Sequence, residues 1–142
     1  MAATAGYSGK PLAQKLGVKE GMTVVAVDPP ANYRKLLGPL PPGAKIVTGP
    51  PAAGKPLAFI HCFATARRAL VSRFGALERA LTPAGMLWIS WPKGTSPVAT
   101  DLTENVVREI GLATGLVDVK VCAVDETWSG LKFVRRVKDR VP

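Results

Sequence analysis

The chain has 142 residues, 47% of them hydrophobic, and it carries a formal net charge of +9 with an isoelectric point near 10.0. We expect residues 1–142 to form a single domain, because this length suits one core and the hydrophobic content is too high for a disordered chain. No apolar run approaches the roughly 20 residues of a membrane-spanning helix and the N-terminal residues lack the apolar stretch of a secretory signal, which predicts a cytoplasmic protein.

The first half of the chain predicts short helices that alternate with short strands. Pro11 suits the start, and Gly17 the end, of a helix over residues 10–16. Apolar runs bounded by Pro and Gly predict strands over 22–27, 44–47 and 57–63, and a second short helix is predicted over 32–37.

The middle of the chain predicts a longer helix followed by the central strand of a sheet. Leu70 and Phe74 recur at helical spacing within residues 66–81, and Thr65 is a candidate N-cap. A Pro/Gly turn then leads into residues 86–89, which are apolar throughout. A strand without polar alternation is typical of a central strand that helices cover on both faces.

The last third of the chain predicts a capped helix and a β-hairpin. Asp101 and Glu104 resemble a capping box for the helix that follows them. Apolar runs predict strands over 117–124 and 131–137, and the short connection 125–130 makes the second strand antiparallel to the first. The order of elements therefore predicts an α/β, three-layer, Rossmann-like fold with a mainly parallel sheet of about six strands, the last of them antiparallel.

Two segments carry a resemblance to a known superfamily. Leu81, Pro83 and Gly85 resemble the L-x-P-G-G turn of class I S-adenosylmethionine-dependent methyltransferases, and the approach to the first strand, LAQKLGVKEGMTVVAVD, resembles their entry segment. The stretches GYSGKPLAQKLG, MLWISWPK, DLTENVVREIGL and VKVCAVDETWSGLKFV together also resemble a small bacterial family of unknown function. The resemblance implies a methyltransferase-like domain of reduced size.

The cofactor-binding positions implied by this resemblance are altered. These methyltransferases have a glycine-rich loop after the first strand, where this sequence has Asp28, Pro29 and Pro30, and prolines have no amide hydrogen. Thr48 and Gly49 stand where the superfamily has an acidic residue for the ribose hydroxyls. We therefore expect no cofactor. S-adenosylmethionine is the alternative, supported by Asp28, which occupies the family's acidic position.

Candidate ligand-binding residues follow from the predicted sheet, because ligands of open α/β sheets bind beyond the carboxyl ends of the strands. The candidates are Asp28, Asn32, Arg67, Ser90, Trp91, Lys93, Asp125, Glu126 and Trp128, with Thr65 beside them. Trp91 has an alternative role in covering the core, and Lys93 has one as a surface ion-pair partner of Asp125 or Glu126.

The sequence predicts neither a catalytic set nor a metal site. Cys62 and Cys122 lie in apolar runs and are expected to be buried structural thiols. His61, the only histidine, adjoins Cys62 and should point to the opposite face of the strand, so the pair cannot share a metal ion.

Positive charge is concentrated towards the two ends of the chain. Residues 1–60 contain seven basic and two acidic side chains, residues 61–127 contain seven of each, and residues 128–142 contain five basic and one acidic. A solvated terminus explains this excess, and so does an anionic partner such as nucleic acid or an acidic protein. The candidate nucleic-acid contacts are Lys132, Arg135, Arg136, Lys138 and Arg140.

Three hypotheses of function follow from these patterns. The leading one is a non-catalytic, methyltransferase-like domain that binds a small ligand or a protein partner at the carboxyl edge of the sheet. The alternatives are a divergent S-adenosylmethionine-dependent methyltransferase and a basic nucleic-acid-binding protein.

Overall fold

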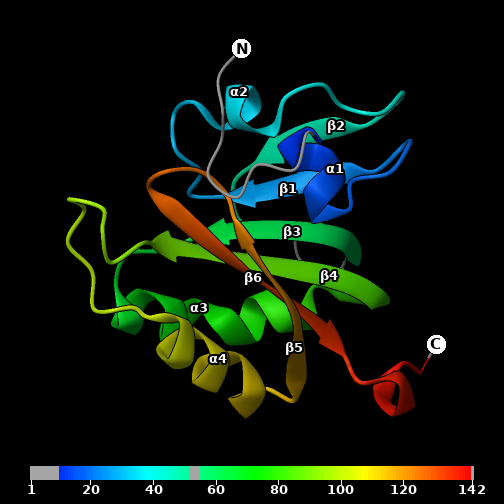
Figure 1. The fold of residues 1–142 in the computed structure, drawn as a ribbon. Coiled ribbons are helices and arrows are strands. Elements are labelled where there is room, and N and C mark those ends of the chain that lie inside the picture. The colour runs from blue at the N-terminus through cyan, green and yellow to red at the C-terminus, as the bar shows by residue number, and fades with distance from the viewer. Residues whose placement is uncertain (1–9, 52–54, 142) are drawn as a thin grey trace.

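A computed structural model describes residues 10–51 and 55–141 and contains one six-stranded sheet (Figure 1). The strands are β1 (Thr23–Val27), β2 (Lys45–Thr48), β3 (Leu57–Phe63), β4 (Leu81–Pro92), β5 (Leu116–Ala123) and β6 (Trp128–Arg135), in the order β2-β1-β3-β4-β6-β5. The pairs β1·β2, β1·β3 and β3·β4 are parallel, and β6 runs antiparallel to both β4 and β5. The predicted fold class is confirmed.

Helices cover both faces of the sheet. The short helices α1 (Leu12–Leu16) and α2 (Tyr33–Leu37) lie on one face, and α3 (Arg67–Arg79) and α4 (Glu104–Ala113) lie on the other (Figure 1). A 3-10 turn, Val137–Asp139, follows β6. None of the helices in the described ranges is long and apolar enough to cross a membrane.

The predicted turn before the central strand is instead part of that strand. β4 begins at Leu81, and its pairing with β3 jumps from Leu57↔Leu81 to Phe59↔Met86, so that five residues of β4 advance against two of β3. This bulge absorbs the Pro/Gly segment without ending the strand. A Cβ atom on Gly85 would lie 2.9 Å from the carbonyl oxygen of Leu57, which explains why a glycine fits there.

The predicted helix caps are wrong, because other residues cap both α3 and α4. The side chain of Thr65 makes no capping bond, and α3 begins after Ala66. Instead, Asp101 accepts a hydrogen bond from the backbone N–H of Arg67 (2.7 Å) and so caps a helix 34 residues earlier in the chain. Thr103 caps α4 by accepting a bond from the backbone N–H of Val106 (3.2 Å).

The hairpin between β5 and β6 is tighter than predicted. Asp125 accepts hydrogen bonds from the backbone N–H groups of Thr127 (2.9 Å) and Trp128 (2.8 Å) and closes the turn. β6 therefore begins at Trp128, inside the segment that the sequence assigned to the turn.

Candidate functional site

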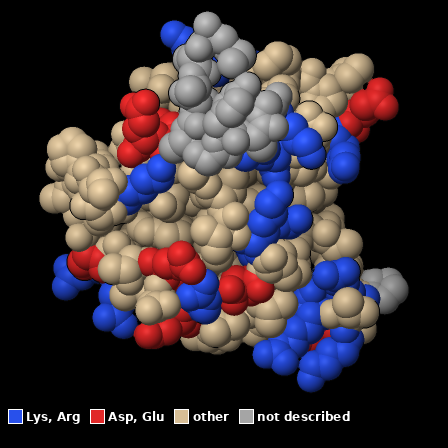
Figure 2. Space-filling view, in the orientation of Figure 1, with Lys and Arg blue, Asp and Glu red and all other residues tan. Residues whose placement is uncertain are grey.

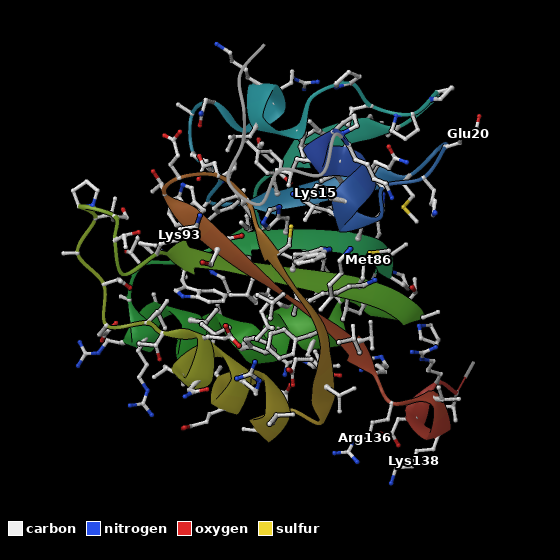
Figure 3. All side chains as sticks on the ribbon, in the orientation of Figure 1. Lys15, Glu20, Met86, Lys93, Arg136 and Lys138 are labelled. Atoms are coloured by element: carbon white, nitrogen blue, oxygen red, sulfur yellow. The ribbon has the colours of Figure 1, made fainter. Side chains whose placement is uncertain are left out.

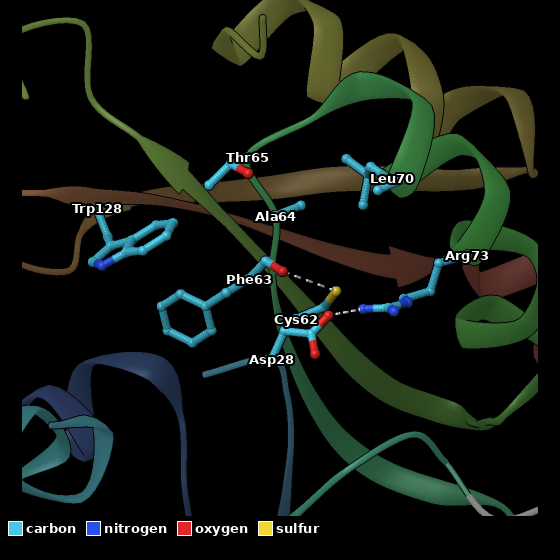
Figure 4. A pocket seen from close by; sticks show the side chains of 9 residues that line it. Asp28, Cys62, Phe63, Ala64, Thr65, Leu70, Arg73 and Trp128 are labelled. Atoms are coloured by element: carbon cyan, nitrogen blue, oxygen red, sulfur yellow. Dashed lines mark hydrogen bonds and ion pairs between the residues drawn. The ribbon is translucent and has the colours of Figure 1, made fainter. Parts of the chain in front are cut away.

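A cavity of about 200 Å³ lies at the carboxyl ends of β1 and β3 (Figure 4). Its lining consists of Asp28, Cys62, Phe63, Ala64, Thr65, Ala69, Leu70, Arg73 and Trp128. The chain leaves β1 towards β2 on one side, whereas β3 continues to β4 on the other. The cavity therefore lies where the strand order reverses, which is where open α/β sheets bind their ligands.

An ion pair spans the mouth of this cavity. Arg73 of α3 donates to the carboxylate of Asp28, the first residue after β1 (Figure 4). The two side chains are 40% and 66% exposed, respectively, and the hydrogen bond to Asp28 raises the pKa of Arg73. Asp28 has φ of +52°, a left-handed conformation that Asp adopts more readily than most residues.

The cavity wall formed by β3 carries a thiol. Cys62 is buried, and burial raises its pKa to about 11, against the opposing influence of the nearby Arg73 guanidinium. The thiol is therefore protonated at neutral pH. Both cysteines are free and buried, as predicted.

A row of three hydrogen-bonded, buried side chains lies on the other face of β3, where His61 points away from Cys62 as predicted. The Tyr33 hydroxyl lies 2.8 Å from Nδ1 of His61, and the Ser90 hydroxyl lies 2.8 Å from Nε2. Burial lowers the pKa of His61 to about 3, so the ring is neutral and uses one nitrogen as a donor and the other as an acceptor. These two hydrogen bonds link α2, β3 and β4.

The two predicted tryptophans differ in environment. Trp91 is 4% exposed and belongs to the core under α3 and α4, which is its alternative, structural role. Trp128 is half-buried and lines the cavity, with its ring edge-on to Phe63 at a centroid distance of 5.0 Å. Because Asp125 binds the Trp128 amide, this carboxylate holds the start of β6 next to the cavity.

The remaining candidates do not line the cavity. Ser90 is fully buried beside His61. Arg67 and Asn32 are exposed at the starts of α3 and α2, respectively. Lys93 donates its backbone N–H to the carbonyl of Thr127 (2.8 Å). No ion pair between Lys93 and Asp125 or Glu126 is among the four that the described residues form.

The basic candidates at the C-terminus divide into two kinds. Arg135 is turned inward: it pairs with the carboxylate of Glu78 and donates to the carbonyls of Glu78 (2.7 Å) and Leu81 (3.1 Å). Arg136, Lys138 and Arg140 are exposed, and Lys132 is half-buried.

Sequence reasoning missed the residues that α3 and the interior of β3 contribute to the cavity, above all Arg73. A signal for Arg73 exists, because it follows the inward-facing Leu70 by three residues and so lies at the edge of the buried stripe. Among the described residues, no group of three His, Cys, Asp or Glu side chains is placed to hold a metal ion.

Solved structures with a similar fold include S-adenosylmethionine-dependent methyltransferases. An S-adenosylmethionine-dependent methyltransferase from Aquifex aeolicus matches with a TM-score of 0.62 and 17% identity over 84% of this chain and 85% of that one. A TehB-like methyltransferase from Corynebacterium glutamicum matches with 0.57 and 13% over 93% and 91%. The magnesium protoporphyrin IX methyltransferase of Synechocystis PCC 6803, solved with bound S-adenosylhomocysteine, matches with 0.58 and 11% over 88% and 78%.

These likenesses show a methyltransferase-like, Rossmann-type fold. No family model matches the chain, and no curated protein sequence matches it.

Proposed function

We propose that this protein binds a small ligand in the cavity at the carboxyl ends of β1 and β3, on a methyltransferase-like scaffold, without S-adenosylmethionine and without catalysing a reaction. The observation that carries the proposal is the Asp28–Arg73 ion pair across the cavity mouth. A methyl-donor nucleoside needs free backbone amides and open space in the loop after β1. Pro29 and Pro30 have no amide hydrogen, and the ion pair occupies the space beside them.

The end of β2 supports the same proposal. Thr48 and Gly49 provide no carboxylate for ribose hydroxyls, and the Gly49 amide is bonded to the carbonyl of Ala26 (2.9 Å). The cavity volume of about 200 Å³ is also below the roughly 300–1,000 Å³ of typical ligand pockets. The residues present therefore do not fit S-adenosylmethionine, and we infer a smaller ligand that contacts Phe63 and Trp128.

The chemistry of the lining supports binding rather than catalysis. Its titratable side chains are Asp28, Cys62 and Arg73. Asp28 is paired with Arg73, and the raised pKa of Cys62 leaves little thiolate to act as a nucleophile at neutral pH. Histidine is the commonest general base, but His61 points to the opposite face of β3 and is hydrogen-bonded at both nitrogens.

Calorimetric titration with S-adenosylmethionine and with S-adenosylhomocysteine tests the absence of the cofactor. We expect no heat of binding from either compound, and a micromolar dissociation constant for either would overturn the proposal.

Native mass spectrometry of freshly purified protein tests the cavity itself. We expect a retained small-molecule mass in the wild type and in Val71→Trp, a control change at an exposed position of α3. The mass should be absent in Ala69→Trp, which places an indole at the cavity wall. Retention of the same mass by Ala69→Trp would place the ligand elsewhere, and no retained mass in the wild type would count against the cavity.

A divergent methyltransferase is the second candidate. Two observations favour it: its fold neighbours include methyltransferases solved with bound S-adenosylhomocysteine, and Asp28 directly follows β1. It predicts that S-adenosylhomocysteine raises the melting temperature of the wild type but not of Asp28→Ala, because a ligand that binds only the native state stabilises that state. A wild type whose melting temperature does not change removes this candidate.

A further inference from the structure

Two lysines face each other on the α1 side of the sheet, and a third lies near them. Lys132 of β6 and Lys120 of β5 are register partners, and the Lys120 ammonium reaches a carbonyl of α1. Lys19 follows α1 and is near enough for its charge to act on Lys132. A bulge in β5 creates this pairing, because the register advances from Asp118↔Phe133 to Lys120↔Lys132 and leaves Val119 without a partner. Like charges directly opposite each other on antiparallel strands are destabilising, so the fold alone gives no reason to place two lysines there.

No carboxylate compensates this charge within the described chain. None of its four ion pairs includes Lys19, Lys120 or Lys132. Burial lowers the pKa of Lys132, and the positive charges of Lys120 and Lys19 lower it further. Lys120 donates to the carbonyl oxygen of Lys15 (3.1 Å), which positions its ammonium group without neutralising it.

A second cationic group follows directly after the end of β6. Arg136, Lys138 and Arg140 are exposed beyond the end of β6, and Arg136 follows Lys132 by four residues, a span of at most about 13 Å. Figure 2 shows basic side chains in the middle of the face that it displays and again near the C-terminus. Figure 3 shows Lys15 on α1, and Arg136 and Lys138 beyond the end of β6. A small anion reaches one group, whereas an extended polyanion reaches both.

We propose that these six side chains form a nucleic-acid-binding surface that contacts the phosphate backbone. We call this surface the β6 basic surface; it consists of Lys19, Lys120, Lys132, Arg136, Lys138 and Arg140. Lysine ammonium groups are compact point charges suited to phosphates, and a nucleic-acid strand repeats its phosphates along its length. Contacts of this kind position a strand without reading its sequence.

This surface differs from the one that the sequence predicted. Arg135 is excluded, because its guanidinium is bonded to Glu78 and Leu81. Lys120, from the neighbouring strand, and Lys19, from the segment after α1, are added. The surface also lies apart from the cavity lining, so the two proposals stand independently.

Fluorescence anisotropy with labelled single-stranded RNA, single-stranded DNA and duplex DNA tests the surface at several salt concentrations. We expect binding to at least one probe that weakens steeply with salt, with a slope of about −0.9 per phosphate contact on duplex DNA. The combined variant Lys19→Gln, Lys120→Gln, Lys132→Gln should weaken binding by at least about tenfold and reduce the slope by roughly three on the duplex.

A charge-matched control separates this surface from net charge. Lys35→Gln, Lys45→Gln and Arg68→Gln together remove the same charge from exposed positions on α2, β2 and α3. We expect this control to bind within about twofold of the wild type. Equal weakening by both triple variants would overturn the proposal, as would the absence of binding to every probe or binding to anionic phospholipid vesicles alone.

A second variant tests the surface without changing a half-buried residue. Lys19→Gln with Lys120→Gln leaves the half-buried Lys132 in place and should still weaken binding several-fold. Circular dichroism melting curves verify the fold of each variant, and a folded double variant with wild-type affinity would contradict the proposed surface.

Discussion

The two helical layers are attached to the sheet in different ways. α3 and α4, with 13 and 10 residues, bury apolar stripes, and Phe74 of α3 meets Phe133 of β6 edge-on at 5.5 Å. Gly111 brings α4 so close to β6 that a Cβ atom there would lie 2.1 Å from the ring of Phe133. On this face, attachment depends on close apolar packing.

The opposite layer combines an apolar core with buried polar contacts. α1 and α2 have five residues each, which is too short for stable isolated helices. Trp88 of β4 donates its indole N–H to the carbonyl of Leu16 at the end of α1 (2.9 Å), and Tyr33 of α2 is joined to His61. Buried apolar residues of both short helices, among them Leu16 and Leu37, also pack in a core cluster on this face, so hydrogen bonds from the sheet add directed contacts to that packing.

Truncating Phe74 should have the largest effect. Phe74→Ala removes a ring that is 1% exposed and its contact with Phe133, so we expect the free energy of unfolding to fall by about 3–5 kcal/mol in urea denaturation. Val71→Ala, at a 54% exposed position of the same helix, is the control and should change it by less than about 0.5 kcal/mol. A small effect at Phe74 would show that packing does not anchor this layer.

The buried His61 on the α1 and α2 face should make the free energy of unfolding depend on pH. The pKa of His61 is about 3 in the folded state and 6.5 when the ring is exposed, so the unfolded state binds more protons between these values. Stability due to this group is therefore present above pH 6.5 and falls as the pH is lowered, by about 1.4 kcal/mol per unit. Urea denaturation at a series of pH values measures this slope.

A variant isolates the contribution of His61 from that of the carboxylates. His61→Gln cannot take up a proton, so its slope between pH 6.5 and 4 should be shallower than that of the wild type by about 1.4 kcal/mol per unit. Parallel slopes in the two proteins would mean that His61 is accessible to protons in the native state.

Elements built from neighbouring residues were predictable from the sequence. Residues 57–63 were predicted as a strand and form β3, because an apolar run bounded by a proline depends only on local residues. The α3 stripe at Leu70 and Phe74 is local in the same sense. The fold class followed from these elements and from the hairpin.

The errors concern contacts between distant residues. Asp101 was assigned to the helix that follows it, but its partner amide is 34 residues earlier. The Asp28–Arg73 pair joins residues 45 apart, so no local pattern indicates it. Pro83 was interpreted as a turn, although a bulge accommodates it within β4. Of the nine candidate residues, Asp28 and Trp128 line the cavity and the other seven do not. Ser90 and Trp91 lie within β4 instead of after it, and the others, which lie at helix starts or in loops after strands, are Asn32, Arg67, Lys93, Asp125 and Glu126.

Removing the cap of α3 should have a smaller effect than the changes at Phe74 and His61. Asp101→Ala removes the carboxylate that accepts from the Arg67 amide, and we expect the free energy of unfolding to fall by about 1 kcal/mol. Thr65→Ala, at the position that the sequence favoured, should have a smaller effect because its side chain makes no capping bond. Chemical denaturation of both variants measures the difference, and the reverse order would restore Thr65 as the cap.

The ion pair at the cavity mouth should contribute least to stability. Asp28 and Arg73 are 66% and 40% exposed, and exposed pairs contribute at most about 1 kcal/mol, so Arg73→Ala should leave the urea midpoint almost unchanged. The same variant opens the loop after β1, and its titration with S-adenosylhomocysteine therefore separates two causes of exclusion. Binding gained by Arg73→Ala would assign the exclusion to the ion pair, whereas continued absence of binding would assign it to Pro29 and Pro30, which remain without amide hydrogens in the variant.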